Sequence, residues 1–202
     1  MILKLFRQSS PERSIRDLYG AIVAQARSPA FYRDYGVPDT VQGRFDLIVL
    51  HLVLVLARIG EAAGQAQGDA RDIGQKLFDQ FCRDLDDNLR EMGVGDLAVP
   101  KRMRGFAEAF YGRQTAYLGA FDAARAHELE NALKRNIFEA GQGDAGKDDA
   151  GSARLAAYAR ATLAQFKAQD LDAFEQALWR GQVAFPRPED IAMPAAETVR
   201  HG

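Results

Sequence analysis

Apolar residues recur at helical spacing along most of this chain, in blocks separated by glycine, proline and polar residues. One block holds Leu77, Phe81, Leu85 and Leu89, and a four-residue period places side chains on one face of a helix. Similar blocks predict helices at residues 11–26, 99–117, 129–137, 155–166 and 171–178. No two segments combine strand-like alternation with hairpin-turn residues. The pattern therefore predicts an all-α fold, a single-domain bundle of about six to eight helices over residues 11–185.

One segment of the chain has no polar face. From Leu47 to Ala57 the only polar residue is His51. A helix that is apolar all round is buried in a protein or in a membrane, and a membrane span needs about 20 apolar residues. This run is shorter, and charged Asp46 and Arg58 bound it, so it is predicted to be the central core helix. His51 is expected to be a buried histidine bonded to a neighbour, because no second histidine or cysteine stands at ligand spacing.

Two helices joined by a glycine turn are predicted for residues 74–112. Gly93 and Gly95 end the first helix, because only glycine enters the left-handed region without a steric penalty. Asp96 is expected to cap the second helix, and Pro100 stands near its start, where the missing N–H is tolerated. The segment is therefore interpreted as a helical hairpin.

The charged residues of this hairpin form pairs on one helix and a cluster on the other. On the first helix, two pairs stand four residues apart, a spacing worth about 0.2–0.5 kcal/mol per pair: Asp79 with Arg83, and Asp86 with Arg90. The first turn of the second helix holds Lys101, Arg102 and Arg104, where the helix dipole disfavours cations by about 0.3–1 kcal/mol. Two interpretations stay open: solvated faces, or a basic turn that binds a partner.

Composition and charge restrict the function classes. With 47% hydrophobic and 27% charged residues, the 202-residue chain is typical of a soluble globular protein. A net charge of −2 does not favour bulk nucleic-acid binding, so no nucleic-acid partner is expected. The single cysteine, Cys82, allows no intramolecular disulfide, and its place on an apolar helix face favours core packing over catalysis. With no signal peptide recognised, we expect a cytoplasmic protein.

The two ends of the chain differ from the predicted domain. Residues 1–10 form a basic and apolar segment, and these members are expected to contact an anionic membrane surface: Ile2, Leu3, Lys4, Leu5, Phe6 and Arg7. The alternative is a frayed terminus, or packing on the domain. Contact would place the protein peripherally at the inner face of the cytoplasmic membrane. Residues 186–202 hold prolines and scattered charges and predict a disordered tail.

The hairpin also carries a family resemblance. The stretch RDLDDNLREMGVGDLAVPKRMRGFAEAFYGR resembles the core signature of the ubiquinol–cytochrome c reductase assembly chaperones. The upstream block PAFYRDYGVPDTVQGRFDLIVLHLVLVL is similar to another segment of that family. The likeness covers residues 11–117 well and continues more loosely to residue 186, while Asp87 and Gln114 are less typical of the signature.

The resemblance implies a non-enzymatic helical protein without a cofactor or metal, which binds newly made cytochrome b and promotes assembly of the reductase. It leaves ribosome contact open, since mitochondrial members work there with a small partner protein. It also implies a set of client- or partner-binding residues: Arg83, Asp84, Asn88, Arg90, Glu91, Lys101, Arg102, Arg104 and Arg113.

Two other functions fit an all-helical chain. In the first, the apolar groove of the bundle holds a lipid or a quinone, because such a pocket and a peptide groove have the same lining residues. In the second, the chain is a prenyl synthase, because Asp84, Asp86 and Asp87 resemble half of one of the two aspartate-rich motifs that hold magnesium in those enzymes. That chemistry needs a facing carboxylate pair, and the other pair, Asp148 with Asp149, stands in a glycine-rich linker. Catalysis is therefore not expected.

Overall fold

The computed structural model describes residues 11–65, 69–121, 126–139 and 149–192. The helices are, in chain order, α1 (Pro11–Ala26), α2 (Pro29–Arg33), α3 (Val41–Gln65), α4 (Asp69–Glu91), α5 (Val99–Ala120), α6 (Ala126–Leu133), α7 (Asp149–Lys167) and α8 (Leu171–Trp179). A π-helical turn, η2 (Lys134–Phe138), follows α6, and a 3-10 turn, η4 (Pro188–Asp190), follows α8. The described residues contain no strand and form one helical domain, which confirms the predicted fold class.

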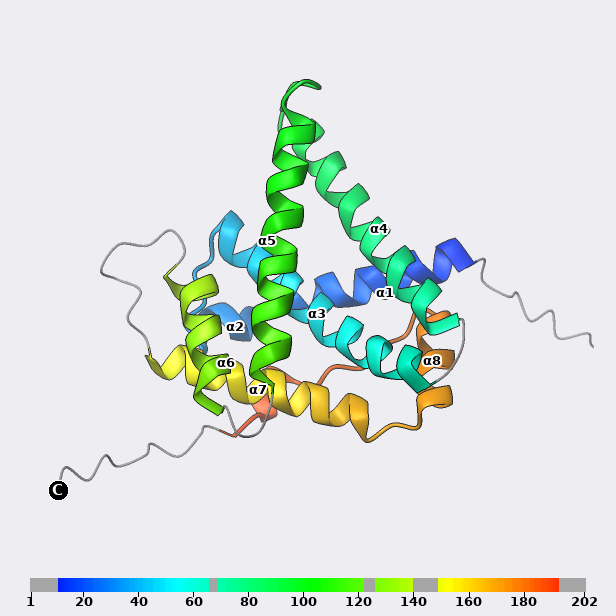
Figure 1. The fold of residues 1–202 in the computed structure, drawn as a ribbon. Coiled ribbons are helices and arrows are strands. Elements are labelled where there is room, and N and C mark those ends of the chain that lie inside the picture. Colours follow the sequence, from blue (N-terminus) through cyan, green and yellow to red (C-terminus); the bar gives the residue numbers. More distant parts are fainter. Residues whose placement is uncertain (1–10, 66–68, 122–125, 140–148, 193–202) are drawn as a thin grey trace, which may run out of the picture.

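Helix α3 is the centre of the domain and contacts α1, α4, α5 and α7 (Figure 1). Between Leu47 and Val55 every side chain is buried except that of Ile48, which is half-buried. A segment without a polar face has no stable position at a surface, so the other helices pack around it. The prediction of a central core helix is confirmed.

A chain of hydrogen bonds around His51 connects four parts of the domain. Its Nδ1 lies 2.7 Å from the carbonyl oxygen of Leu47, which can only accept, so Nδ1 carries the proton. Its Nε2 then accepts from the hydroxyl of Tyr158 on α7, 3.0 Å away. Gln25 on α1 donates through Nε2 to that hydroxyl at 3.0 Å and to the carbonyl of Pro186 at 3.1 Å. The expected buried, hydrogen-bonded histidine is confirmed, and burial lowers the pKa of His51 to about 4.

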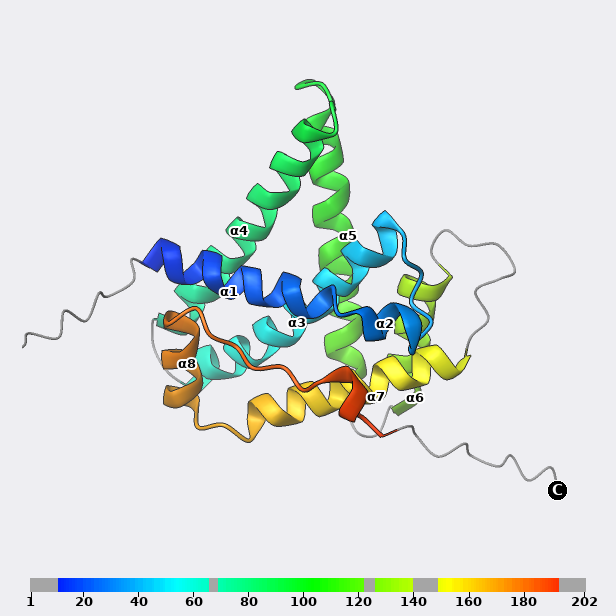
Figure 2. The same cartoon turned by 180° about the vertical axis from the view of Figure 1, so that it is seen from behind.

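Helices α4 and α5 form a hairpin that projects from the domain and opens toward it (Figures 1 and 2). Gly93 has a φ of 79° and ends α4: its N–H donates to Arg90 at 2.9 Å, and the next N–H, of Val94, donates to Leu89 at 3.0 Å. This pattern is the usual glycine closure of a helix. The predicted cap is wrong, because no side chain caps α5 and the Asp96 carboxylate instead pairs with Arg90.

The segment after α8 packs back across the domain (Figure 2). The Phe185 ring lies 5.2 Å from that of His51, and the Tyr35 hydroxyl donates to the Pro188 carbonyl at 2.7 Å. The packed part of the chain therefore extends beyond residue 185, where the disordered tail was expected to begin.

The segment predicted to contact a membrane, residues 1–10 with Ile2, Leu3, Lys4, Leu5, Phe6 and Arg7, lies outside the described residues. Among the helices that are described, none is both long and apolar enough to cross a membrane.

Candidate binding groove and hairpin tip

A groove of about 220 Å³ lies where α1, the start of α3, α4 and α5 meet. We call it the groove, and define it by its lining residues: Tyr19, Arg27, Val41, Gln42, Arg44, Phe45, Ile48, Phe81, Asp84, Leu85, Asn88, Leu89, Met92 and Phe106. Most of these side chains are aliphatic or aromatic. Helices α4 and α5 join at the glycine turn and diverge toward the domain (Figure 1), and the groove lies on the side where α1 and the start of α3 meet them.

Aromatic rings form the floor of the groove, and aliphatic side chains stand open to solvent beside them. The Phe45 ring lies 6.2 Å from that of Phe81 and 5.2 Å from that of Phe106, so it connects α3 to α4 and α5. Val41 and Met92 line the same groove but are 78% and 71% exposed. Large exposed hydrophobic side chains that adjoin one another are typical of interaction sites.

Two signature residues line the groove from α4. The Asp84 carboxylate accepts a 2.8 Å hydrogen bond from the Tyr19 hydroxyl, and both burial and this carboxylate raise the pKa of Tyr19. Asn88 lies one turn further toward the tip and is exposed. On the opposite wall, Arg44 is held by Asp39 at 2.7 Å. The groove thus combines an apolar floor with polar groups at its margins.

The other predicted residues of α4 lie outside the groove. Arg83, Arg90 and Glu91 are exposed, and the predicted pair of Asp86 with Arg90 is present at 2.6 Å. The predicted pair between Arg83 and Asp79 is not recorded in the described structure; Nη1 of Arg83 instead lies 3.4 Å from the side-chain oxygen of a neighbouring glutamine.

The apex of the hairpin, residues 92–104, is called here the hairpin tip. It holds the three cations of the predicted basic turn, Lys101, Arg102 and Arg104, all exposed on the first turns of α5. Leu97 is 100% exposed at the same apex. The sequence does not single out Leu97, because this residue lies in a turn, where no helical periodicity of hydrophobic residues identifies a position.

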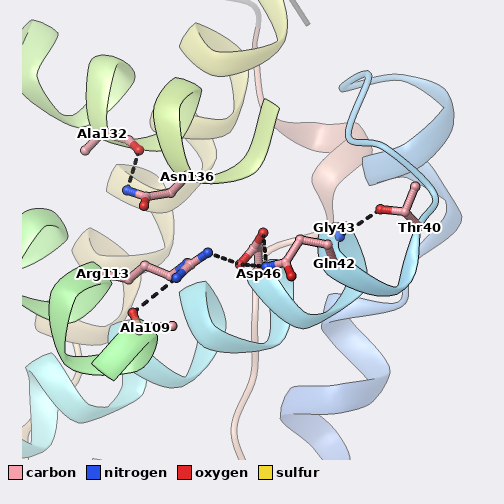
Figure 3. A network of polar contacts seen from close by, with 8 residues as sticks. All are labelled: Thr40, Gln42, Gly43, Asp46, Ala109, Arg113, Ala132 and Asn136. Carbon is pink, nitrogen blue, oxygen red and sulfur yellow. Dashed lines mark hydrogen bonds and ion pairs between the residues drawn. The ribbon is translucent and has the colours of Figure 1, made fainter. Parts of the chain in front are cut away.

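Arg113 lies in a different environment from the rest of the predicted set (Figure 3). Its side chain is 11% exposed, and Nη2 lies 2.7 Å from Oδ1 of Asp46, which is fully buried. Gln42 donates to both oxygens of Asp46 at 3.0 Å, and the Arg113 guanidinium lies 5.8 Å from the ring of Phe45. Burial raises the pKa of Asp46 to about 6, and Arg113 and Gln42 act against this rise. The ion pair connects α3 to α5 inside the domain.

The groups considered for catalysis have other roles. Asp84 is bonded to Tyr19, and Asp86 is paired with an arginine on its own helix. Within the described parts of the chain, no group of three or more His, Cys, Asp or Glu residues could hold a metal. Burial raises the pKa of the half-buried Cys82 thiol, which makes it a poorer nucleophile. The arrangement is suited to binding.

Fold and groove together describe an all-α, single-domain protein with an open apolar groove. The chain belongs to the ubiquinol-cytochrome C chaperone family, whose sequence model matches residues 33–181. A solved structure, the crystal structure of the Cbp3 homolog from Brucella abortus, is 34% identical to the chain and superimposes with a TM-score of 0.73. That match covers 95% of this chain and 100% of the Brucella chain. No curated protein matches the chain.

Proposed function

We propose that this protein is a non-enzymatic assembly chaperone that binds newly made cytochrome b and promotes assembly of ubiquinol–cytochrome c reductase. Membership of the ubiquinol-cytochrome C chaperone family supports the general role. The observation that carries the proposal is the groove, an apolar surface that the described residues leave open. Cytochrome b is a membrane protein, and its helices present apolar faces that need cover before they reach lipid.

The shape of the groove favours a helix over a small molecule. Pockets that enclose a lipid-sized or drug-sized ligand have volumes of about 300–1,000 Å³ and bury most of its surface. The groove measures about 220 Å³ and leaves Val41 and Met92 largely exposed. An open apolar groove of this kind suits one face of a partner helix, with anchors at helical spacing. We therefore favour a client helix over the lipid or quinone alternative.

Six of the nine signature residues divide into three roles in this proposal. Asp84 and Asn88 contact the client directly, since they line the groove beside its apolar floor. Arg83, Arg90 and Glu91 lie on the exposed side of α4 and meet parts of the client, or a second protein, outside the groove. Arg113 acts indirectly, because its buried pair with Asp46 fixes α5 against α3 and so sets the width of the groove.

Photo-crosslinking in the native host tests the proposal. A photoreactive amino acid at Val41 stands in the groove, and the same group at Leu118 is the matched control, because Leu118 is 43% exposed on α5 and does not line the groove. We expect cytochrome b to be captured from Val41 and not from Leu118. Equal capture from both positions, or capture from Leu118 alone, would exclude the groove as the client site. Failure to capture cytochrome b from any position on the surface would reject the client.

Activity in cells gives a second readout. Val41→Asp places a charge beside the apolar floor without altering the core, because Val41 is 78% exposed. We expect this variant to lower the amount of assembled reductase at unchanged melting temperature, while Leu118→Asp leaves assembly normal. Normal assembly with Val41→Asp would contradict the role of the groove.

A further inference from the structure

The hairpin tip lies at the point of the described domain furthest from its core (Figure 1). Leu97 is 100% exposed, and Met92, at the other side of the glycine turn, is 71% exposed. Neither side chain belongs to the core cluster of the domain. A turn that closes a hairpin needs glycine or polar residues, and a fully exposed leucine adds nothing to that geometry. These two exposed side chains are therefore available to contact a partner surface outside the domain.

Three cations follow Leu97 within seven residues of the chain, on the first turns of α5. Lys101, Arg102 and Arg104 are exposed, and no ion pair to any of them is recorded in the described parts of the chain. Their position at the start of α5 is unfavourable, because the helix dipole is positive at that end. By contrast, Arg90 on the α4 side is neutralised by Asp86 at 2.6 Å and by Asp96 at 2.5 Å. The α5 edge of the tip is thus locally basic at some cost to the fold.

The α4 edge of the tip carries the opposite charge. Asp87 and Glu91 are exposed near the end of α4, and a uniformly anionic surface would repel them. The two carboxylates lie on α4 and the three cations on α5, so an approach along α5 brings the cations closest to such a surface. The charge distribution therefore selects both the sign of the partner and the direction of approach.

We propose that the hairpin tip docks on an anionic phospholipid surface through its α5 edge. Leu97 and Met92 enter the boundary between headgroups and acyl chains, while Lys101, Arg102 and Arg104 lie against lipid phosphates. Exposed hydrophobic side chains flanked by Lys and Arg are the usual composition of a surface that lies in a membrane interface. Each cation close to an anionic membrane contributes about a fivefold factor to the partition coefficient.

Docking would also orient the groove. Met92 lines the groove as well as the tip, so a docked tip places one end of the groove against the bilayer. An apolar client segment could then move between groove and lipid with little exposure to water. This consequence rests on the proposed function, whereas the docking itself does not.

Vesicle sedimentation with the full chain tests the docking without any client. The probes are vesicles of phosphatidylcholine with about 30% phosphatidylglycerol, and vesicles of phosphatidylcholine alone. We expect binding to the anionic vesicles only, weakening as salt rises, because exposed charges are screened beyond about 8–10 Å. The triple variant Lys101→Ala, Arg102→Ala, Arg104→Ala should lose about 100-fold in partition coefficient. Leu97→Asp should lose at least about tenfold.

A matched control separates the tip from net charge. Arg135→Ala, Arg180→Ala, Arg187→Ala removes three exposed cations from other parts of the domain and should retain most of the binding. Equal losses of vesicle binding in the two triple variants would show that binding depends only on net charge, and would overturn the proposal. Unchanged binding in the tip variant, with loss in Lys4→Ala, Arg7→Ala, would assign membrane contact to residues 1–10 instead and would also overturn it.

A fluorescent probe reports where the tip lies. The single tryptophan, Trp179, is replaced by Phe, and Leu97→Trp then places the only tryptophan at the tip. We expect a blue shift on adding anionic vesicles, and quenching by lipids brominated on their acyl chains. Vesicle binding without either change would show that another surface touches the lipid. If the tip variant binds vesicles normally but loses crosslinking of cytochrome b from Val41, the basic turn serves the client and the membrane proposal fails.

Discussion

Replacing Arg113 tests whether its buried ion pair holds the hairpin on the core. Arg113→Met keeps the length of the side chain and removes its charge. Asp46 is then left fully buried with Gln42 as its remaining partner. Removing one member of a buried pair costs about 3–5 kcal/mol, because the other charge stays out of water without compensation. The two hydrogen bonds from Gln42 place the expected loss at the lower end, about 3 kcal/mol, or about 6–12 °C in melting temperature.

The pH dependence of this loss follows from the pKa of Asp46. That pKa is raised to about 6, from an ordinary value of 3.8, so the folded state favours the protonated carboxyl. The stability that the protonated Asp46 carboxyl contributes is fully present below pH 3.8 and is lost as pH rises through about 6. Without Arg113 the carboxyl takes up a proton at still higher pH. The destabilisation by Arg113→Met should therefore be large at pH 7.5 and clearly smaller at pH 5.

Urea unfolding at both pH values measures these free energies, with Arg104→Met as the control on the same helix. Arg104 is exposed, so its replacement should change the free energy of unfolding by less than about 0.5 kcal/mol. The double variant Asp46→Leu, Arg113→Met removes both charges and should recover most of the loss. A loss below about 1 kcal/mol for Arg113→Met at pH 7.5 would refute the role of this pair, as would additive effects in the double variant.

Three further predictions concern the core. Leu50→Ala should cost about 2–5 kcal/mol in urea unfolding, because Leu50 is fully buried in α3, whereas Leu118→Ala on the surface should cost far less. The buried Tyr117 hydroxyl has no hydrogen-bond partner among the described residues, so Tyr117→Phe should leave stability unchanged or raise it by about 1 kcal/mol; a clear loss would reveal a partner. Burial lowers the pKa of His51 from 6.5 to about 4, so its contribution is present above pH 6.5 and disappears as pH falls through about 4. A His51→Phe variant should lack this loss of unfolding free energy at acid pH, which amounts to about 3 kcal/mol in total.

The elements of the fold could be predicted from local patterns. The apolar run around His51 excluded any surface position for α3, and the glycine at position 93 marked the end of α4, because both signals lie within a few consecutive residues. The predicted capping role of Asp96 failed, since a carboxylate in a turn can pair with an arginine as readily as with a backbone N–H. Local patterns do not decide between such partners.

The groove could be predicted only in part. Asp84 and Asn88 were identified through the signature on α4, but Tyr19 and Phe45 come from α1 and α3 and meet them only in the folded chain. The partner of Arg113 had no local signal either, because Asp46 was interpreted only as a charge at the end of an apolar run. Such contacts depend on how helices far apart in the sequence cross, and hydrophobic periodicity does not contain that information.

The projecting hairpin gives this molecule two unequal levels of local stability. Amide protons of residues 47–55 in α3 are protected by packing and should exchange with solvent only when the whole domain unfolds. At the hairpin tip the Arg102 N–H bonds to Ala98 within an exposed turn, so its exchange requires only local opening. The tip can therefore open locally while the core around α3 stays folded.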